Sequence, residues 1–177
     1  MSPCKSCEKR RRRKLLVRFG ILLIAFAVLL TSALFANQPK QIGKHIAPHS
    51  ILSFTYTYSS SVNPPNYIRY QFSMEDGAPV FRYEYRKGNH WPLTEEDISD
   101  ASSVFLTHAQ WQEMLSCLEN GKVTRRKTQT ESGDAGPWTY ITWRGDKGKY
   151  QQFSFPDTGK RADFERLCVQ WAQPVCP

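Results

Sequence analysis

An uncharged run of 18 residues, from Phe19 to Ala36, sets the strongest limit on what this chain can form. As an α-helix it would be about 27 Å long, close to the roughly 30 Å hydrocarbon core of a bilayer. Residues 15–17 are also apolar, and they lengthen the helix if the Arg18 side chain snorkels to the headgroups. We therefore expect a transmembrane anchor over residues 15–36, so that the folded domain is built from the residues after it.

The charge distribution orients this anchor. Residues 1–18 hold eight Lys/Arg and one Glu, a net charge of +7 out of the total of +8, and six of these cations form the run KRRRRK at residues 9–14. A positive flank stays in the cytoplasm, so we expect a basic cytoplasmic stub over residues 1–14 and an extracytoplasmic remainder at the cell membrane. That remainder has a net charge of only +1, which argues against nucleic acid as a partner.

A cleaved signal peptide is the alternative to an anchor. Thr31, Ser32 and Ala33 provide the small residues of a cleavage site, and cleavage there would release a secreted domain. The long basic leader and the length of the apolar run favour the uncleaved form. The chain has no Asn-X-Ser/Thr acceptor, which fits a bacterial cell envelope better than a eukaryotic surface.

After a stalk over residues 37–50, three segments show the two-residue period of β-strands. Apolar and polar side chains alternate over residues 51–58, 68–74 and 81–85, with turn-rich residues between them. Two further strands, residues 138–144 and 149–155, flank a Gly-Asp-Lys-Gly turn. The pattern predicts a three-strand meander plus a hairpin, about five strands. Residues 104–106 fit a strand or a buried connector, and residues 122–136 show no period and indicate a flexible excursion.

Two segments show the helical period. Thr107 and Gln110 match a capping box at the start of the first segment, and Gly121 stands where its C-terminal cap belongs. Apolar residues then recur at i, i+3, i+4 and i+7 in both segments: Trp111, Met114, Leu115 and Leu118, then Phe164, Leu167, Cys168 and Trp171. We expect an α+β domain over residues 51–177, with two amphipathic helices covering one face of an antiparallel sheet.

The sheet face away from those helices is the best candidate for binding. Arg69, Arg82 and Arg86 alternate with inward aromatic residues and share this face, which makes them candidate binding residues for an anionic partner. Glu75 and Glu84 lie among them, so a charge-mixed solvated surface is the competing interpretation.

Catalytic and metal-binding chemistry have little support in the sequence. The motifs GxSxG, HExxH, SxxK and GxGxxG and the P-loop are all missing, and we expect no cofactor and no metal. His90 stands near Glu95 and Asp97, which could form a general acid–base pair of a small envelope enzyme. Acidic residues after Thr94 are equally typical of a helix start.

The five cysteines fall into two groups. Cys4 and Cys7 form a lone CxxC, which lacks the four ligands of a structural zinc site. Three more lie in the extracytoplasmic part, where an oxidising compartment favours one disulfide. We rank Cys168–Cys176 first, then Cys117–Cys176, then Cys117–Cys168, with three reduced thiols as the alternative.

These features predict a single-pass membrane-anchored extracytoplasmic binding or interaction module, non-catalytic, of a bacterial cell envelope. Its partners would be the lipid bilayer and an anionic envelope polymer or a membrane protein. The alternatives are the small enzyme that uses His90 and the secreted form.

Overall fold

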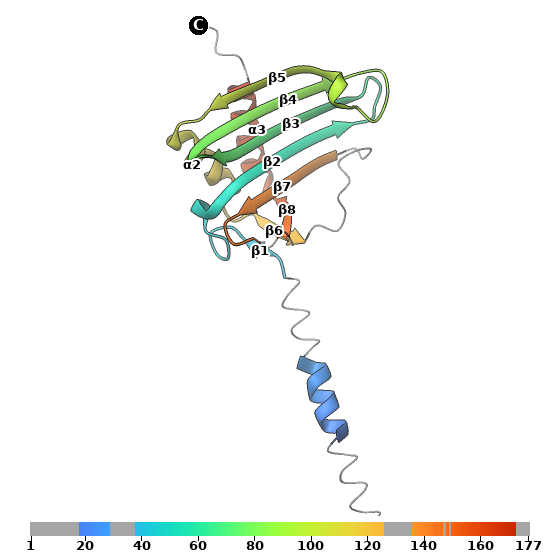
Figure 1. Cartoon of the computed structure of the whole chain (residues 1–177), viewed down its shortest axis with the longest axis vertical. Coiled ribbons are helices and arrows are strands. Elements are labelled where there is room, and N and C mark those ends of the chain that lie inside the picture. The colour runs from blue at the N-terminus through green and yellow to red at the C-terminus, as the bar shows by residue number, and fades with distance from the viewer. Residues whose placement is uncertain (1–17, 29–37, 126–135, 147, 149, 173–177) are drawn as a thin grey trace, which may run out of the picture. The chain divides into compact units, whose positions relative to one another are not determined.

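The computed structural model describes residues 18–28, 38–125, 136–146, 148 and 150–172. The chain divides into two compact units, Met1–Gln38 and Pro39–Pro177. In the first unit, residues 18–28 are helical (Figure 1, blue), and the other residues of the predicted anchor, 15–17 and 29–36, lie outside the described residues. Among the described helices, none combines the length and the apolar character needed to cross a membrane.

The second unit is an α+β fold built on one antiparallel sheet. Within the described residues the sheet has eight strands in the order β1-β6-β8-β7-β2-β3-β4-β5, shown in Figure 1. In chain order the strands are β1 (Lys40–Gln41), β2 (Ile51–Ser60), β3 (Asn66–Glu75), β4 (Ala78–Lys87), β5 (Ile98–Phe105), β6 (Lys122–Arg125), β7 (Gly136–Trp143) and β8 (Tyr150–Ser154). The predicted meander is β2-β3-β4, and the predicted hairpin is β7-β8.

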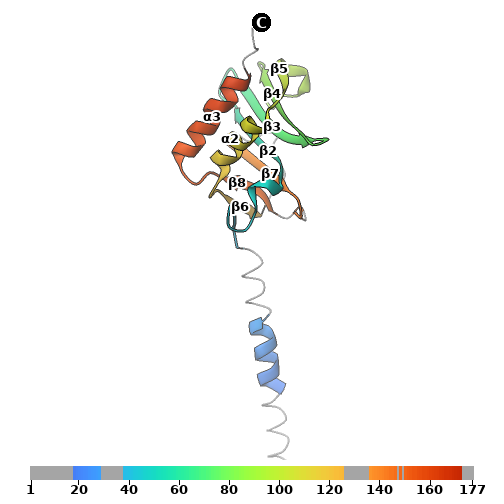
Figure 2. The ribbon, with the colours of Figure 1, turned by 90° about the vertical axis from the view of Figure 1, so that its left-hand side faces the viewer.

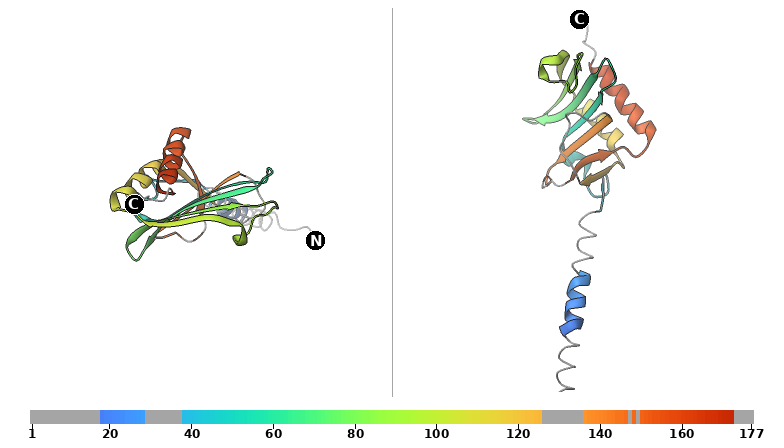
Figure 3. Two further views of the ribbon diagram at one scale, coloured as in Figure 1. Left: turned by 90° about the horizontal axis from the view of Figure 1, so that it is seen from above. Right: turned by 90° about the vertical axis from the view of Figure 1, so that its right-hand side faces the viewer.

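Two helices, α2 (His108–Leu118) and α3 (Thr158–Ala172), lie on the same face of the sheet, as the views in Figures 2 and 3 show. The capping box predicted at the start of α2 is confirmed, because Thr107 and Gln110 cap each other's backbone N–H groups. The predicted apolar stripes are confirmed as well, since every residue of both stripes is buried. Two single-turn 3₁₀ helices, Pro48–Ser50 and Glu95–Asp97, complete the unit.

The prediction of about five strands is wrong. The three additional strands were missed because none of them shows a hydrophobic period along its whole length. β5 is exposed along nearly its whole length, so it has no apolar face to give a two-residue alternation. β1 and β6 have only two and four residues, too few to show a period, and β6 lies within the segment predicted as an excursion. β1 lies in the predicted stalk, where Ile42 and Ile46 are buried in the core of the second unit.

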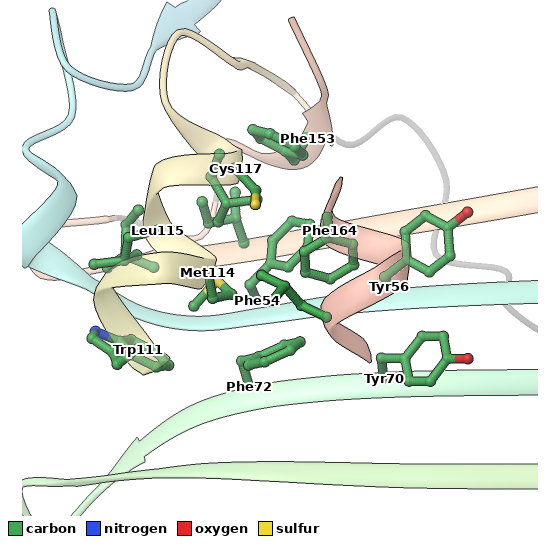
Figure 4. Close-up of a cluster of buried hydrophobic side chains, with 14 of the residues drawn as sticks. Phe54, Tyr56, Tyr70, Phe72, Trp111, Met114, Leu115, Cys117, Phe153 and Phe164 are labelled. Atoms are coloured by element: carbon green, nitrogen blue, oxygen red, sulfur yellow. The ribbon is translucent and has the colours of Figure 1, made fainter. Parts of the chain in front are cut away.

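Aromatic side chains fill the space between the sheet and the helices (Figure 4). Phe164 of α3 is fully buried and meets Phe54 edge to face, with ring centroids 5.2 Å apart, and Phe72 at 5.5 Å. Such contacts add to the hydrophobic gain from burial. Gly121 allows this packing, because a Cβ atom at that position would lie 2.1 Å from the ring of Phe153.

Candidate functional site

The face of the sheet opposite α2 and α3 carries the three candidate arginines. The strand register arranges its side chains in rows that cross β7, β2, β3, β4 and β5. Two neighbouring rows are Trp138, Thr57, Arg69, Glu84 and Ala101, and Tyr140, Thr55, Gln71, Arg82 and Ser103. We name the face formed by these two rows the open face, although Thr57 within it is fully buried. The prediction that Arg69, Arg82 and Arg86 share one side of the sheet agrees with this register.

Each candidate arginine is ion-paired with a glutamate. Arg69 Nη2 lies 2.5 Å from Glu84 Oε2, and Arg86 Nε lies 2.5 Å from Glu84 Oε1, so one carboxylate bridges two guanidinium groups. Arg82 holds Glu75 with both terminal nitrogens, and its Nη2–Oε2 distance is 2.7 Å. The arginines are therefore fixed in position by their partners, which the sequence alone did not predict.

Arg86 differs from the other two because it is buried. It is 8% exposed, its guanidinium lies 4.7 Å from the ring centroid of Tyr67, and its Nη1 approaches the carbonyl of Leu93 at 3.5 Å. Leu93 is itself buried, because the segment between β4 and β5 folds over this end of the sheet. Arg86 thus packs the covered end of the sheet, and it is not placed to meet a partner from solvent.

Arg69 and Arg82 border a hollow of about 380 Å³ on the open face. Their side chains keep exposed fractions of 29% and 42%, whereas the Glu84 side chain is 15% exposed. The hollow exists because Ala101 and Ser103 of β5 carry small side chains beside the long ones of β3 and β4. The full lining is Arg69, Gln71, Arg82, Tyr83, Glu84, Ala101, Ser102 and Ser103.

The carboxylates of this cluster are ionised. The hydrogen bond from Arg82 lowers the pKa of Glu75 to about 2. Burial raises the pKa of Glu84, but the hydrogen bonds from Arg69 and Arg86 outweigh it, so the net pKa lies below its ordinary value. Arg69, Arg82, Glu75 and Glu84 carry no net charge between them, and the one surplus positive charge of the cluster comes from the buried Arg86. Arg69 and Arg82 are more exposed than Glu84, and Glu75, with a side chain that is 40% exposed, is about as exposed as Arg82.

His90 lies beside Asp97, one of its two predicted acidic partners, in the loop between β4 and β5. Its Nε2 lies 3.0 Å from Asp97 Oδ1, and its Nδ1 lies 3.2 Å from the Pro92 carbonyl, so both ring nitrogens already have partners within the loop. Asp97 also accepts the Thr94 backbone N–H, which is the main cause of its lowered pKa. Glu95, the other predicted partner, is exposed. In the described part of the chain no group of His, Cys, Asp and Glu side chains could hold a metal ion.

A second polar cluster, which sequence reasoning missed, joins α3 to the sheet. Tyr56 Oη donates to Glu165 Oε1 at 2.5 Å, and Arg161 donates to both groups at 2.9 and 2.8 Å. It borders a hollow of about 390 Å³. Burial raises the pKa of Tyr56, so its hydroxyl is protonated, and its contacts with Glu165 and Arg161 link β2 to α3. The i, i+4 spacing of Arg161 and Glu165 on a predicted helix was the one sequence feature that indicated their ion pair.

The cysteines that the structure describes are reduced. Cys117 and Cys168 are free and buried, so the disulfide considered between them does not form. Burial raises the pKa of both thiols, that of Cys168 well above its ordinary value. The structure shows none of the three ranked pairings, because each of them needs Cys117 or Cys168 and both are free. Cys4, Cys7 and Cys176 lie outside the described residues.

Comparison of the chain with protein-family models, with curated proteins and with solved structures found no significant match.

Proposed function

We propose that this protein is a single-pass membrane-anchored extracytoplasmic binding module, non-catalytic, of a bacterial cell envelope, and that its open face takes an anionic partner. The observation that carries the proposal is the hollow on the helix-free face, bordered by the partly exposed guanidinium groups of Arg69 and Arg82. Guanidinium groups held in fixed positions lose little entropy when they bind a further carboxylate or phosphate.

The membrane anchor in this proposal is supported by the sequence. Residues 19–36 carry no charge and follow a basic run, and residues 18–28 are helical. Protease added to spheroplasts should digest residues 39–177 and leave an N-terminal fragment in the membrane. Release of an intact domain into the medium would instead show that the segment is a cleaved signal peptide.

Binding is tested with the full-length protein in nanodiscs of zwitterionic lipid. Fluorescent polyglutamate and alginate serve as carboxylate probes, and polylysine and neutral dextran as controls. We expect at least one carboxylate probe to bind, with an affinity that falls as salt rises, because exposed charges are screened at high ionic strength. The double substitution Arg69→Gln and Arg82→Gln should weaken binding about tenfold, since each lost ion pair at a partly exposed side chain contributes roughly 0.2–1 kcal/mol.

The control removes one positive charge elsewhere and is therefore compared with the single variants Arg69→Gln and Arg82→Gln. Arg166 lies on α3 and pairs with Asp163 with a side chain that is 72% exposed, so Arg166→Gln changes the net charge without touching the open face. This variant should bind as the wild type does. If Arg166→Gln weakens binding as much as either single open-face variant does, overall charge attracts the probe and the open face does not. The absence of carboxylate binding would refute the proposal.

A further inference from the structure

Positive charge is concentrated at one end of the second unit, where the neighbouring strands β1, β6, β8 and β7 lie (Figure 1). β1 pairs with β6 at the edge of the sheet, and the Arg144 N–H, directly after β7, donates to the Ser50 carbonyl at 2.7 Å. We name the end formed by residues 40–49, 119–125 and 144–146 the basic end.

The basic end has an excess of cations, whereas the rest of the unit has an excess of carboxylates. The charged residues of the basic end are five cations and two carboxylates: Lys40, Lys44, Lys122, Arg125 and Arg144, and Glu119 and Asp146. The other described residues between 39 and 172 include seven Lys/Arg and eleven Asp/Glu. The near-neutral total of the domain therefore conceals a separation of charge between this end and the rest.

Three cations of the basic end are available to an external anion. Lys44, Lys122 and Arg144 are exposed, and no ion pair joins their side chains to another described residue. In this they differ from the arginines of the open face, each of which is held by a glutamate. Lys40 lies over the Trp143 ring, with Nζ 5.3 Å from the ring centroid.

The two carboxylates of the basic end offset only part of this charge. Asp146 accepts the Gly148 N–H at 3.0 Å, within the turn that follows β7. Glu119 lies beside the turn that holds Lys44, because a Cβ atom on Gly43 would be 3.9 Å from Glu119 Cγ. Five cations and two carboxylates leave an excess of three positive charges at this end.

The chain before β1 ties the basic end to the membrane. The predicted anchor ends at residue 36 and β1 begins at Lys40, so four Cα–Cα steps span at most about 14 Å. Exposed charges act over roughly 8 Å at physiological ionic strength, a distance of the same order. Each Lys or Arg near an anionic bilayer surface raises the bound population about fivefold. The charge excess therefore lies where it can meet lipid headgroups.

We propose that the basic end docks on anionic phospholipid headgroups of the membrane that holds the anchor. This inference rests on the membrane anchoring in the proposed function, and it adds a second binding surface, separate from the open face. Six strand spacings separate β1 from β4, so the hollow beside β4 lies up to roughly 29 Å from the docked edge. Docking would thus fix the orientation of the sheet and leave the open face accessible to its partner.

The test uses the full-length protein in nanodiscs of phosphatidylcholine, with or without phosphatidylglycerol. A photoreactive residue replaces Ala47, an exposed residue of the basic end, and in a second sample it replaces Gln170, an exposed residue of α3. We expect lipid adducts from position 47 to be at least about fivefold more abundant with phosphatidylglycerol, and to decline as salt rises. Position 170 should give few lipid adducts in either disc.

Two double variants separate local charge from overall charge. Lys44→Gln with Lys122→Gln removes two exposed cations of the basic end, and Lys87→Gln with Arg166→Gln removes two exposed cations elsewhere. The first pair should lower the phosphatidylglycerol-dependent adducts at least about fivefold, and the second should leave them unchanged. In the wild type, phosphatidylglycerol should also slow hydrogen exchange in residues 42–50. This measurement needs no substitution, so it decides the question even if a variant fails to fold.

Three results would overturn this inference. Equal adducts from position 47 in both discs, with unchanged hydrogen exchange, would show that the short tether alone brings this end to the bilayer. Equal losses in the two double variants would show that overall charge attracts the lipid. Adducts from position 170 as abundant as those from position 47 would show that the basic end is not the surface that docks. None of these results bears on the open face, which is tested with carboxylate probes in zwitterionic lipid, and only cleavage of the anchor would overturn both proposals.

Discussion

The substitution Arg86→Gln tests whether the arginines of the sheet have the separate roles that the geometry gives them. The Arg86 side chain is 10% exposed, hydrogen-bonds Glu84 at 2.5 Å and stacks 4.7 Å from the Tyr67 ring centroid. A desolvated cation–π contact contributes roughly 2 kcal/mol. Loss of one partner from a buried ion pair costs roughly 3–5 kcal/mol, but less here, because Glu84 keeps Arg69. We expect a total loss of about 2–4 kcal/mol in the free energy of unfolding.

Arg69→Gln is the matched comparison, because it removes the other arginine from the same carboxylate. Its side chain is 29% exposed, so we expect a loss of about 1 kcal/mol or less. Both values are measured by urea unfolding of the full-length protein in detergent micelles, followed by tryptophan fluorescence. If Arg86→Gln lies within about 0.5 kcal/mol of the wild type, Arg86 is not a structural residue and the assignment of the covered end of the sheet is wrong.

Three further predictions concern the core. Trp111→Ala and Trp171→Ala should each lower the free energy of unfolding by roughly 3–5 kcal/mol, as truncation of a buried aromatic side chain does. An unchanged melting temperature would show that the corresponding helix does not dock on the sheet. Gly121→Ala should lower the free energy of unfolding by roughly 1–3 kcal/mol, because the added Cβ would lie 2.1 Å from a buried ring. A variant that unfolds at the same urea concentration as the wild type would contradict this packing. Cys117 and Cys168 should resist iodoacetamide in the native protein and react with it in urea, because burial raises the pKa of both thiols. Mass spectrometry of the peptides that contain them measures this, and labelling of the native protein would contradict it.

The sequence predicts the part of the fold whose side chains have one wet and one buried face. The sequences of β2, β3 and β4 alternate because the helices cover only one side, and the stripe from Trp111 to Leu118 has helical spacing for the same reason. Burial follows this alternation only in part, because in β2 Thr57 and Ser59 are buried whereas Leu52 and Tyr58 are exposed. β5 is exposed on both faces, so no hydrophobic pattern marks it. Its existence depends on backbone pairing with β4, a long-range contact that composition does not reveal.

The sequence predicts which face of the sheet carries the candidate site, but not the contacts within the site. Alternation alone places the three arginines on one side of the sheet. Their pairing depends on the register that sets Arg69 opposite Glu84, and the burial of Arg86 depends on the loop that brings Leu93 over the sheet. Both are tertiary features. The contact of Tyr56 with Glu165 joins residues 109 positions apart, and for the same reason it could not be predicted from spacing.

Photo-crosslinking in intact cells tests the central claim most directly. A photoreactive residue at Gln71, which lines the hollow, is compared with one at Gln170, an exposed position on α3. The account predicts a discrete adduct from Gln71 that disappears when Arg82→Gln is added, and no such adduct from Gln170. Equal adducts from both positions, or none from Gln71, would contradict the assignment of the open face as the binding surface.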